Sequence, residues 1–296
     1  MKISGFTFIR NGIALQYPFV ESIQSILPIC DEFVVAVGNS DDGTREVIEK
    51  IHPQKIRIID TVWDETKRQG GKILAEQTNI AFDTITGDWG FYLQGDEVIH
   101  ENDLPKIKEA AEKYLNDASI DGLLFKWLHF FGNYDYIAKP FSRGAYPFEV
   151  RMIKNNKSIR SYLDAQGFRK FSSDNPEKGK RLQVKKVEAT VYHYGKVRGP
   201  VSELERAKSF NRLWHDDEWV KKFSEGKDEF DYVTKFPLEK FKGSHPAVMK
   251  ERISNVNWNF IPDKKNIQIP FKYKLQNELQ AITGWRPFEF TNYKVV

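Results

Sequence analysis

Two adjacent carboxylates, Asp96 and Glu97, follow an apolar segment of this 296-residue chain. The segment from Trp89 to Leu93 is aromatic and aliphatic, which is typical of a buried strand, and the chain turns at Gly95 directly before the two acids. Open α/β sheets bind ligands at the carboxyl ends of their strands. Mg2+ and Mn2+ prefer oxygen ligands, and Mg2+ is often held by one or two carboxylates together with substrate phosphates. The pair therefore predicts a metal–diphosphate site, with a solvated acidic turn as the alternative.

Apolar and amphipathic segments alternate regularly through the first 100 residues. Strands are predicted at 3–9, 32–37, 55–60 and 89–93, and helices at 17–27, 45–51 and 71–84. This alternation indicates an α/β fold with a mostly parallel sheet that helices cover on both faces. Right-handed crossovers place the loops that follow the strands at one edge of the sheet. We therefore expect the polar residues of these loops to converge with Asp96 and Glu97.

The regular alternation of strands and helices ends after residue 100. A helix is predicted at 104–115 and strands at 122–131, 150–153 and 185–194, with long loops at 132–149 and 161–183 between them. From about residue 200 the chain becomes helical and charged, and its end is rich in aromatic residues and proline. We expect one α/β domain over 1–200 and a helical, aromatic-rich extension over 201–296 packed on it.

Composition excludes several classes of protein. The net charge of +4 is compatible with an anionic substrate, but the basic residues are spread among acidic ones and no nucleic-acid-binding module is recognised. The single cysteine, Cys30, excludes a disulfide framework within the chain. The sequence has no leader-like N-terminus and no apolar run as long as a membrane span. We expect a cytoplasmic protein, and a peripheral contact with the inner face of the membrane is compatible with the sequence.

Four segments in the first 100 residues resemble family 2 glycosyltransferases of the GT-A fold, a Rossmann-related architecture. They are the opening strand with Arg10-Asn11-Gly12, the strand and turn Asp31-Glu32-Phe33-Val34-Val35-Ala36-Val37-Gly38-Asn39-Ser40-Asp41-Asp42-Gly43-Thr44, the helix at 71–81, and Trp89 to Glu97. The last segment is similar to the family's metal-binding Asp-x-Asp motif. Gln94 stands where the first Asp of that motif usually lies, and Asn39 where an Asp commonly contacts the nucleobase. Both residues keep the hydrogen-bonding shape of Asp but lose its charge, and the change at Gln94 implies metal dependence less strongly than the full motif does.

The resemblance implies a nucleotide-diphosphate sugar as donor, a glycan or lipid-linked acceptor, inversion at the anomeric carbon and a divalent cation, Mn2+ or Mg2+. A general base on the acceptor hydroxyl is then expected. Asp164 is the preferred candidate, Glu149 the second and Asp135 a third. The metal ligands implied are Asp96, then Glu97 and His193, each of the last two with a structural role as the alternative.

The resemblance also implies a set of residues that contact the nucleotide sugar. They are Phe8, Arg10, Asn11, Asn39, Asp41, Lys67, Lys72, Gln94 and Gly95. Lys196 and Arg198 are candidates for the diphosphate, with solvated surface as the alternative. Trp127, His129, Phe130, Tyr134, Tyr136 and Tyr146 are candidates for an acceptor groove, with the protein core as the alternative.

Two other functions are compatible with the sequence. Gln94 and Asn39 are also compatible with a relative that binds a nucleotide sugar or glycan but has no catalytic activity. A nucleotidyltransferase on a related sheet usually has a Gly-rich basic loop after the first strand, and Arg10-Asn11-Gly12-Ile13-Ala14 is not such a loop. We therefore favour a glycosyltransferase.

Overall fold

The computed structural model describes residues 1–138, 146–165, 167–232, 237–262, 271–283 and 291–296. Its first four strands pair in parallel in the order β3–β2–β1–β4. They are β1 (Ile3–Ile9), β2 (Glu32–Gly38), β3 (Ile56–Thr61) and β4 (Trp89–Tyr92). β1, β2 and β4 are buried along almost their whole length, as expected for strands that helices cover on both faces, whereas β3 at the edge of the sheet has exposed Arg57 and Asp60.

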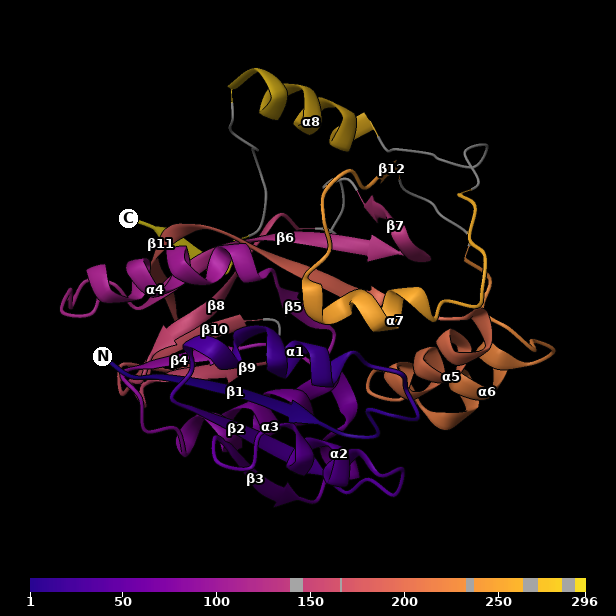
Figure 1. Cartoon of the computed structure of the whole chain (residues 1–296), viewed down its shortest axis with the longest axis horizontal. Helices are drawn as coiled ribbons and strands as arrows, with labels where there is room; N and C mark the ends of the chain where they lie inside the picture. Colours follow the sequence, from indigo (N-terminus) through magenta and orange to yellow (C-terminus); the bar gives the residue numbers. More distant parts are fainter. Residues whose placement is uncertain (139–145, 166, 233–236, 263–270, 284–290) are drawn as a thin grey trace.

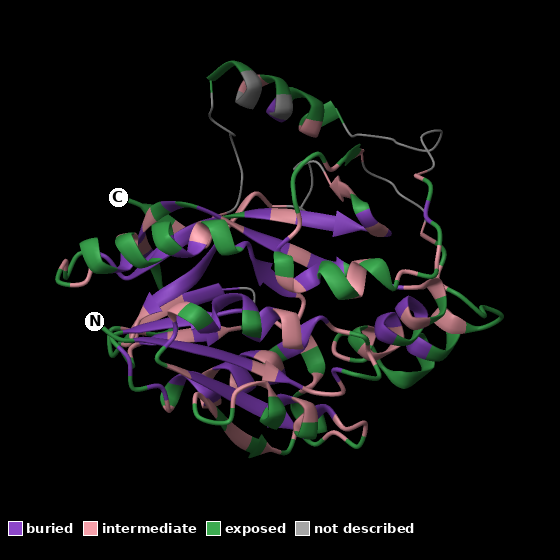
Figure 2. Cartoon of the chain, in the orientation of Figure 1, coloured by how far each residue is buried: buried purple, intermediate pink, exposed green. Residues whose placement is uncertain are grey.

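Helices cover both faces of this sheet, as predicted. α1 (Phe19–Ile26), α2 (Thr44–Ile51) and α4 (Leu104–Lys113) bury their apolar residues in one core cluster, and α3 (Lys72–Asp83) packs in a second cluster on the opposite face. Figure 2 shows buried residues along the strands and exposed residues on the outward sides of these helices. The α/β class and the mostly parallel arrangement of the core strands are confirmed.

The sheet continues beyond β4 with strands of both directions. β8 (Phe148–Lys154) runs antiparallel to β4, and the order continues through β6 (Gly122–Phe131), β11 (Asn175–Lys196), β10 (Gly167–Ser172) and β9 (Ile159–Tyr162). The predicted loop at 161–183 is therefore wrong, because β10 and the first part of β11 form a hairpin there. The predicted loop at 132–149 contains β7 (Asn133–Ala138), which pairs with β6 and with β12 (Leu238–Lys240); residues 139–145 of it lie outside the described part.

A three-residue strand, β5 (Glu97–Ile99), brings the acidic turn to β11. It pairs antiparallel with β11, with Glu97 opposite His193, and the backbone N–H of Tyr194 donates to the carbonyl of Asp96 at 2.8 Å. This pairing places two segments almost 100 residues apart side by side at the edge where β1 and β4 end.

The last third of the chain is helical in its described parts, but its final residues return to the sheet. It contains α5 (Pro200–Asn211), α6 (Asp217–Ser224), α7 (Lys250–Ser254) and α8 (Phe271–Thr283), and β13 (Tyr293–Val295) pairs in parallel with β11. Figure 1 shows α5 and α6 at the right, on the side toward which β1 and β3 point. The division into domains at residue 200 remains a prediction. No helix in the described ranges has the length and apolarity needed to cross a membrane.

Candidate active site

A cavity of about 710 Å3 lies at the carboxyl ends of β1 and β4. This volume is within the range of about 300–1,000 Å3 that is common for small-molecule sites. Eight of the residues predicted for the nucleotide sugar, the metal or the general base line it: Phe8, Arg10, Asn11, Gln94, Gly95, Asp96, Asp164 and His193. The convergence expected from right-handed crossovers therefore holds for the loops after β1 and β4.

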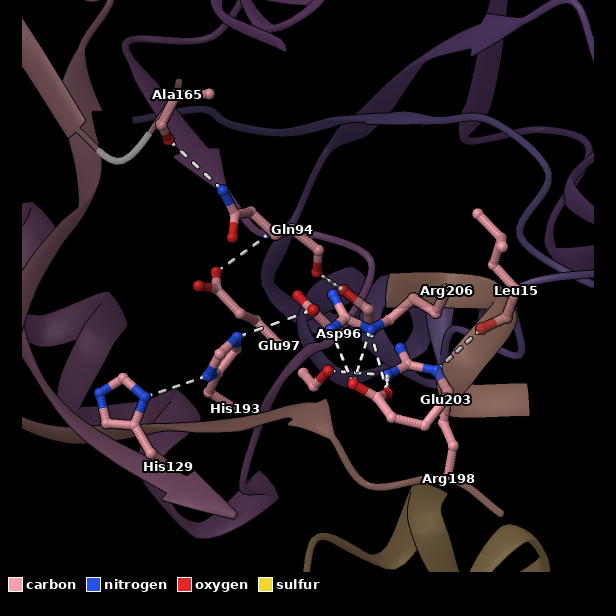
Figure 3. A network of polar contacts seen from close by, with 12 residues as sticks. Leu15, Gln94, Asp96, Glu97, His129, Ala165, His193, Arg198, Glu203 and Arg206 are labelled. Atoms are coloured by element: carbon pink, nitrogen blue, oxygen red, sulfur yellow. Dashed lines mark hydrogen bonds and ion pairs between the residues drawn. The ribbon is translucent and has the colours of Figure 1, made fainter. Parts of the chain in front are cut away.

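Asp96 and His193 meet at the wall of this cavity. His193 Nε2 lies 3.6 Å from Asp96 Oδ2, and the two side chains are 22% and 17% exposed. Burial alone would raise the pKa of Asp96, but His193 and the guanidinium groups of Arg198 and Arg206 outweigh it and lower that pKa to about 2. Asp96 is therefore an anion at any physiological pH. Figure 3 shows the two side chains pointing toward one another.

A carboxylate and an imidazole at this separation fit a divalent cation. Two atoms that each lie about 2.1 Å from one ion can be about 3 to 4 Å apart. The described ranges hold no cluster of three or more His, Cys, Asp or Glu side chains arranged for a metal. The remaining positions around such an ion would thus fall to water and substrate phosphates, which is the usual situation for Mg2+.

Glu97 has a different environment from its neighbour. Its carboxylate accepts hydrogen bonds from Nε and Nη2 of Arg151 on β8, both at 2.7 Å, and neither side chain is exposed at all. Glu97 also accepts from the backbone N–H of Gln94 at 3.1 Å, which fixes the turn before Asp96. Both carboxylate oxygens are thus engaged away from the cavity, and this geometry favours the structural alternative over metal ligation.

His129 contacts His193 on the side away from Asp96. The two Nδ1 atoms are 3.1 Å apart, and His129 Nε2 lies 3.0 Å from the carbonyl oxygen of Tyr146. Burial and the neighbouring charge of His193 lower the pKa of His129 to about 3. Trp127 stacks on His193 at 4.9 Å between ring centroids. Of the aromatic residues proposed for an acceptor groove, Trp127, His129 and Tyr146 line the cavity, whereas Phe130 and Tyr134 are buried in a separate core cluster.

Asp164 lies in a strained turn that faces the cavity. The residues on either side, Leu163 and Ala165, have φ of 54° and 59°, which is uncommon for residues other than glycine. The amide of Gln94 donates to the carbonyl of Ala165 at 3.4 Å, so the residue in the first Asp position of the motif contacts the Asp164 turn. An Asp at position 94 could not make this bond while ionised, because it has no donor.

The alternative base, Glu149, lies behind the cavity wall. It is 4% exposed, does not line the cavity, and accepts a hydrogen bond from the backbone N–H of Val150 at 2.8 Å. Burial raises the pKa of Glu149 to about 7, although Arg151 opposes this effect. Asp164 is thus the candidate with access to a substrate. Asp135, the third candidate, is on β7 and does not line the cavity either.

Residues expected at the nucleoside divide into those that line the cavity and those behind it. Phe8 packs against Trp63 at 6.0 Å between ring centroids, and the guanidinium of Arg10 lies 5.1 Å from the Trp63 ring. The buried side-chain oxygen of Asn11 has no hydrogen-bond partner among the described residues. Asn39 accepts from the backbone N–H of Trp63 at 3.3 Å and therefore supports the wall from outside.

The other charged candidates in this group do not line the cavity. Asp41, Lys67 and Lys72 are exposed, and Lys67 forms an ion pair with Glu76 at 2.9 Å. Arg68, which belongs to the same basic segment, does line the cavity and pairs with Asp217 at 3.2 Å.

Helix α5 supplies a wall that the sequence analysis missed. Arg206 lines the cavity and is held by Glu203, which also pairs with the buried Arg198 at 3.0 Å. Lys196 lines the cavity, as expected of a residue that contacts the diphosphate. Arg198 does not line the cavity and is only 1% exposed, so it neither contacts a diphosphate there nor lies on the solvated surface. The spacing of Glu203 and Arg206, three residues apart in a helix, is typical of an ion pair. The sequence around them does not indicate that this ion pair faces the cavity.

A comparison with family models identifies the family of this chain. Residues 18–173 match the model of the family described as "Glycosyl transferase family 2", which is more than half of the chain. The chain therefore belongs to glycosyl transferase family 2 and is a glycosyltransferase. A comparison with curated proteins gives no match.

Several solved glycosyltransferase structures are distantly similar. S. aureus TarS is 16% identical, with a TM-score of 0.40 over 71% of this chain and 39% of TarS. TarS 1–349 in complex with UDP-GlcNAc is 14% identical, with a TM-score of 0.38 over 75% of this chain and 70% of that one. The mannosyltransferase PcManGT from Pyrobaculum calidifontis, in complex with GDP-Man and Mn2+, is 20% identical, with a TM-score of 0.32 over 41% of this chain and 34% of that one. At these scores the similarities carry no argument about ligands.

Proposed function

We propose that this glycosyltransferase moves a sugar from a nucleotide-diphosphate sugar to a glycan or lipid-linked acceptor, with inversion and with the assistance of a divalent cation. The observation that carries the proposal is that Asp96, His193 and Asp164 line one cavity at the carboxyl edge of the sheet. The two residues proposed as cation ligands and the carboxylate proposed as base thus face the same cavity.

The donor would lie along the cavity from β1 to α5. Phe8 and Trp63 offer aromatic faces for the base. The side-chain oxygen of Asn11, which has no hydrogen-bond partner among the described residues, could accept a hydrogen bond from the nucleoside. Asp96 and His193 would hold Mn2+ or Mg2+, which when bound neutralises negative charge on the leaving diphosphate. Lys196 and Arg206 lie at the same wall and would add positive charge beside the phosphates.

Asp164 would act as the general base. It would take the proton of the acceptor hydroxyl while the oxygen of that hydroxyl attacks the anomeric carbon and the nucleoside diphosphate leaves from the opposite face. Because the attacking oxygen and the leaving group are on opposite faces, the configuration of the anomeric carbon is inverted. Glu149 is too buried to reach an acceptor without movement of the wall.

The test is release of nucleoside diphosphate from a panel of UDP-, GDP- and CDP-sugars with MnCl2, with and without saccharide acceptors. We expect one donor to turn over, faster with an acceptor than with water alone, and activity to be lost with EDTA. Binding of a nucleotide sugar without any turnover would instead indicate a silent binding relative. Equal turnover in EDTA would contradict metal assistance.

A further inference from the structure

The contact between His129 and His193 is directional, because only one of two facing imidazole nitrogens can carry the hydrogen. His129 Nε2 lies 3.0 Å from the carbonyl of Tyr146, and a carbonyl can only accept, so this nitrogen carries a hydrogen and donates. His129 is 9% exposed, and its hydrogen-bond partners among the described residues are that carbonyl and an imidazole, with no carboxylate. A buried imidazole with such partners is neutral, because burial disfavours its charged form.

The tautomer of His193 follows from that of His129. A neutral His129 with its hydrogen on Nε2 has a lone pair on Nδ1, and this lone pair faces His193 Nδ1 at 3.1 Å. His193 must therefore donate from Nδ1. When His193 is neutral, its own Nε2 then has a free lone pair, directed at the cavity beside Asp96 Oδ2 at 3.6 Å. Figure 3 shows this succession of His129, His193 and Asp96.

Packing holds His129 and His193 in these orientations. Trp127 stacks on His193 with an interplanar angle of 24° and contacts His129 edge-on at 4.8 Å between centroids. The guanidinium of Arg151 lies 4.8 Å from the ring of Trp127, and Arg151 is itself bound to Glu97. A 180° flip of either ring would place carbon atoms where its nitrogens lie and would break the hydrogen bond between the two histidines.

We propose that His129 is a positioning residue that fixes His193 as the Nδ1–H tautomer, so that His193 Nε2 is presented with Asp96 as a ligand for a divalent cation. A histidine that ligates a metal usually donates its other N–H to a carbonyl, carboxylate or water, and loss of such a partner typically weakens metal binding about 10- to 100-fold. Here the acceptor is a second histidine. This inference rests on the proposed metal assistance, but the tautomer itself does not.

The first experiment measures the tautomer in the metal-free protein. The chain has six histidines, so long-range 1H–15N correlation spectra at pH 8 can be assigned with single His→Phe variants. We expect His193 to carry its hydrogen on Nδ1 in the wild-type protein and to exchange between tautomers in His129→Phe. A wild-type His193 with its hydrogen on Nε2 would overturn the proposal, and this outcome needs neither metal nor donor. The proposed glycosyltransferase activity could therefore be disproved without affecting the outcome of this tautomer measurement.

The second experiment titrates MnCl2 and follows paramagnetic broadening of His193. We expect His129→Phe to weaken Mn2+ binding about 10- to 100-fold. His129→Gln should restore most of the affinity, because its amide can donate to Tyr146 and accept from His193. Unchanged Mn2+ binding in His129→Phe would contradict the positioning role, and the wild-type tautomer still decides the proposal if that variant does not fold.

His245→Phe is the matched control. His245 is a partly buried histidine whose Nε2 lies 3.1 Å from the carbonyl of Tyr134, but its Nδ1 faces the hydroxyl of Tyr194 at 2.8 Å rather than His193. Its replacement removes comparable packing and two hydrogen bonds. We expect it to lower the melting temperature without changing the tautomer of His193 or the affinity for Mn2+.

Discussion

Asp96 and Glu97 are neighbours in the chain, yet their carboxylates serve different purposes. Glu97 is fully buried against Arg151, whereas Asp96 lies beside His193 at the cavity. Adjacent residues of an extended segment point to opposite sides, so one acid can fix the turn while the other faces a ligand. The sequence predicts that both matter, but it cannot tell which one is available to a cation, since that depends on which strand lies opposite.

Replacement of Asp164, the proposed general base, tests the chemical assignment at the residue scale. We expect Asp164→Asn to lower kcat by about 10²- to 10⁴-fold, because general-base catalysis is lost, while donor affinity stays unchanged. Steady-state kinetics and donor titration check this.

Glu149→Gln is the companion to that variant. If Asp164→Asn remains active and Glu149→Gln does not, Glu149 is the base. The structure predicts the opposite, because Glu149 does not line the cavity.

The buried carboxyl group of Glu149 should also make the free energy of unfolding depend on pH. Its pKa is raised to about 7 in the folded protein, so between about pH 4.5 and 7 the native state binds more protons than the unfolded state, and the free energy of unfolding falls as pH rises. Glu149→Gln should remove this loss, which is at most about 3 kcal/mol. Urea unfolding at pH 5 and 8 measures it, and Glu188→Gln, at an exposed position of β11, controls for the loss of one negative charge. An equal pH slope in wild type and Glu149→Gln would contradict the assignment.

At the scale of elements, the start of α3 supports the Asp164 turn. A Cβ built at Gly71 would lie 2.8 Å from the Cβ of Asp164 and 3.3 Å from Trp214, and Gly71 has φ of +68°. Its N–H also donates to the carbonyl of Leu213, just after α5, at 3.1 Å. The glycine therefore allows α3, the Asp164 turn and the end of α5 to approach one another.

Gly71→Ala should move Asp164 and lower kcat while nucleotide affinity is retained. Gly70→Ala is the matched control, because Gly70 has nearly the same conformation, with φ of +73°, but a Cβ at this position would have no described residue within 4 Å. In both variants the alanine has a left-handed backbone conformation, which lowers the free energy of unfolding by about 1 kcal/mol. An equal kcat in the two variants would show that the contact with Asp164 has no catalytic importance.

The elements of the first 100 residues could be predicted because their signals are local. β2 and β4 are continuous apolar runs, β1 is apolar at Ile3, Phe6, Phe8 and Ile9, and the helices between these strands have a clear apolar side. β5 could not be predicted, since three residues carry no periodicity and its pairing partner, β11, is almost 100 residues away. For the same reason the partnership of Glu97 with Arg151, and of His193 with His129, appears only when the order of the strands is known.

At the scale of the whole molecule, the two halves of the chain contribute different sides of one cavity. Residues 18–173 match the family model, and they supply Asp96 and Asp164. His193 and the α5 wall with Arg206 follow the matched region, and the final strand β13 returns to pair with β11. Features that distinguish this enzyme from other members of its family, including its choice of acceptor, are therefore expected in the later part of the chain.

The proposed function depends most on Asp96 as a metal ligand at a nucleotide-diphosphate site. The most direct measurement is calorimetric binding of UDP, GDP and CDP with and without MnCl2, for the wild type and Asp96→Ala, with thermal melts to confirm folding. We expect one nucleotide to bind the wild type in a Mn2+-dependent manner and Asp96→Ala to lose this dependence while remaining folded. Unchanged Mn2+-dependent affinity in Asp96→Ala would contradict it.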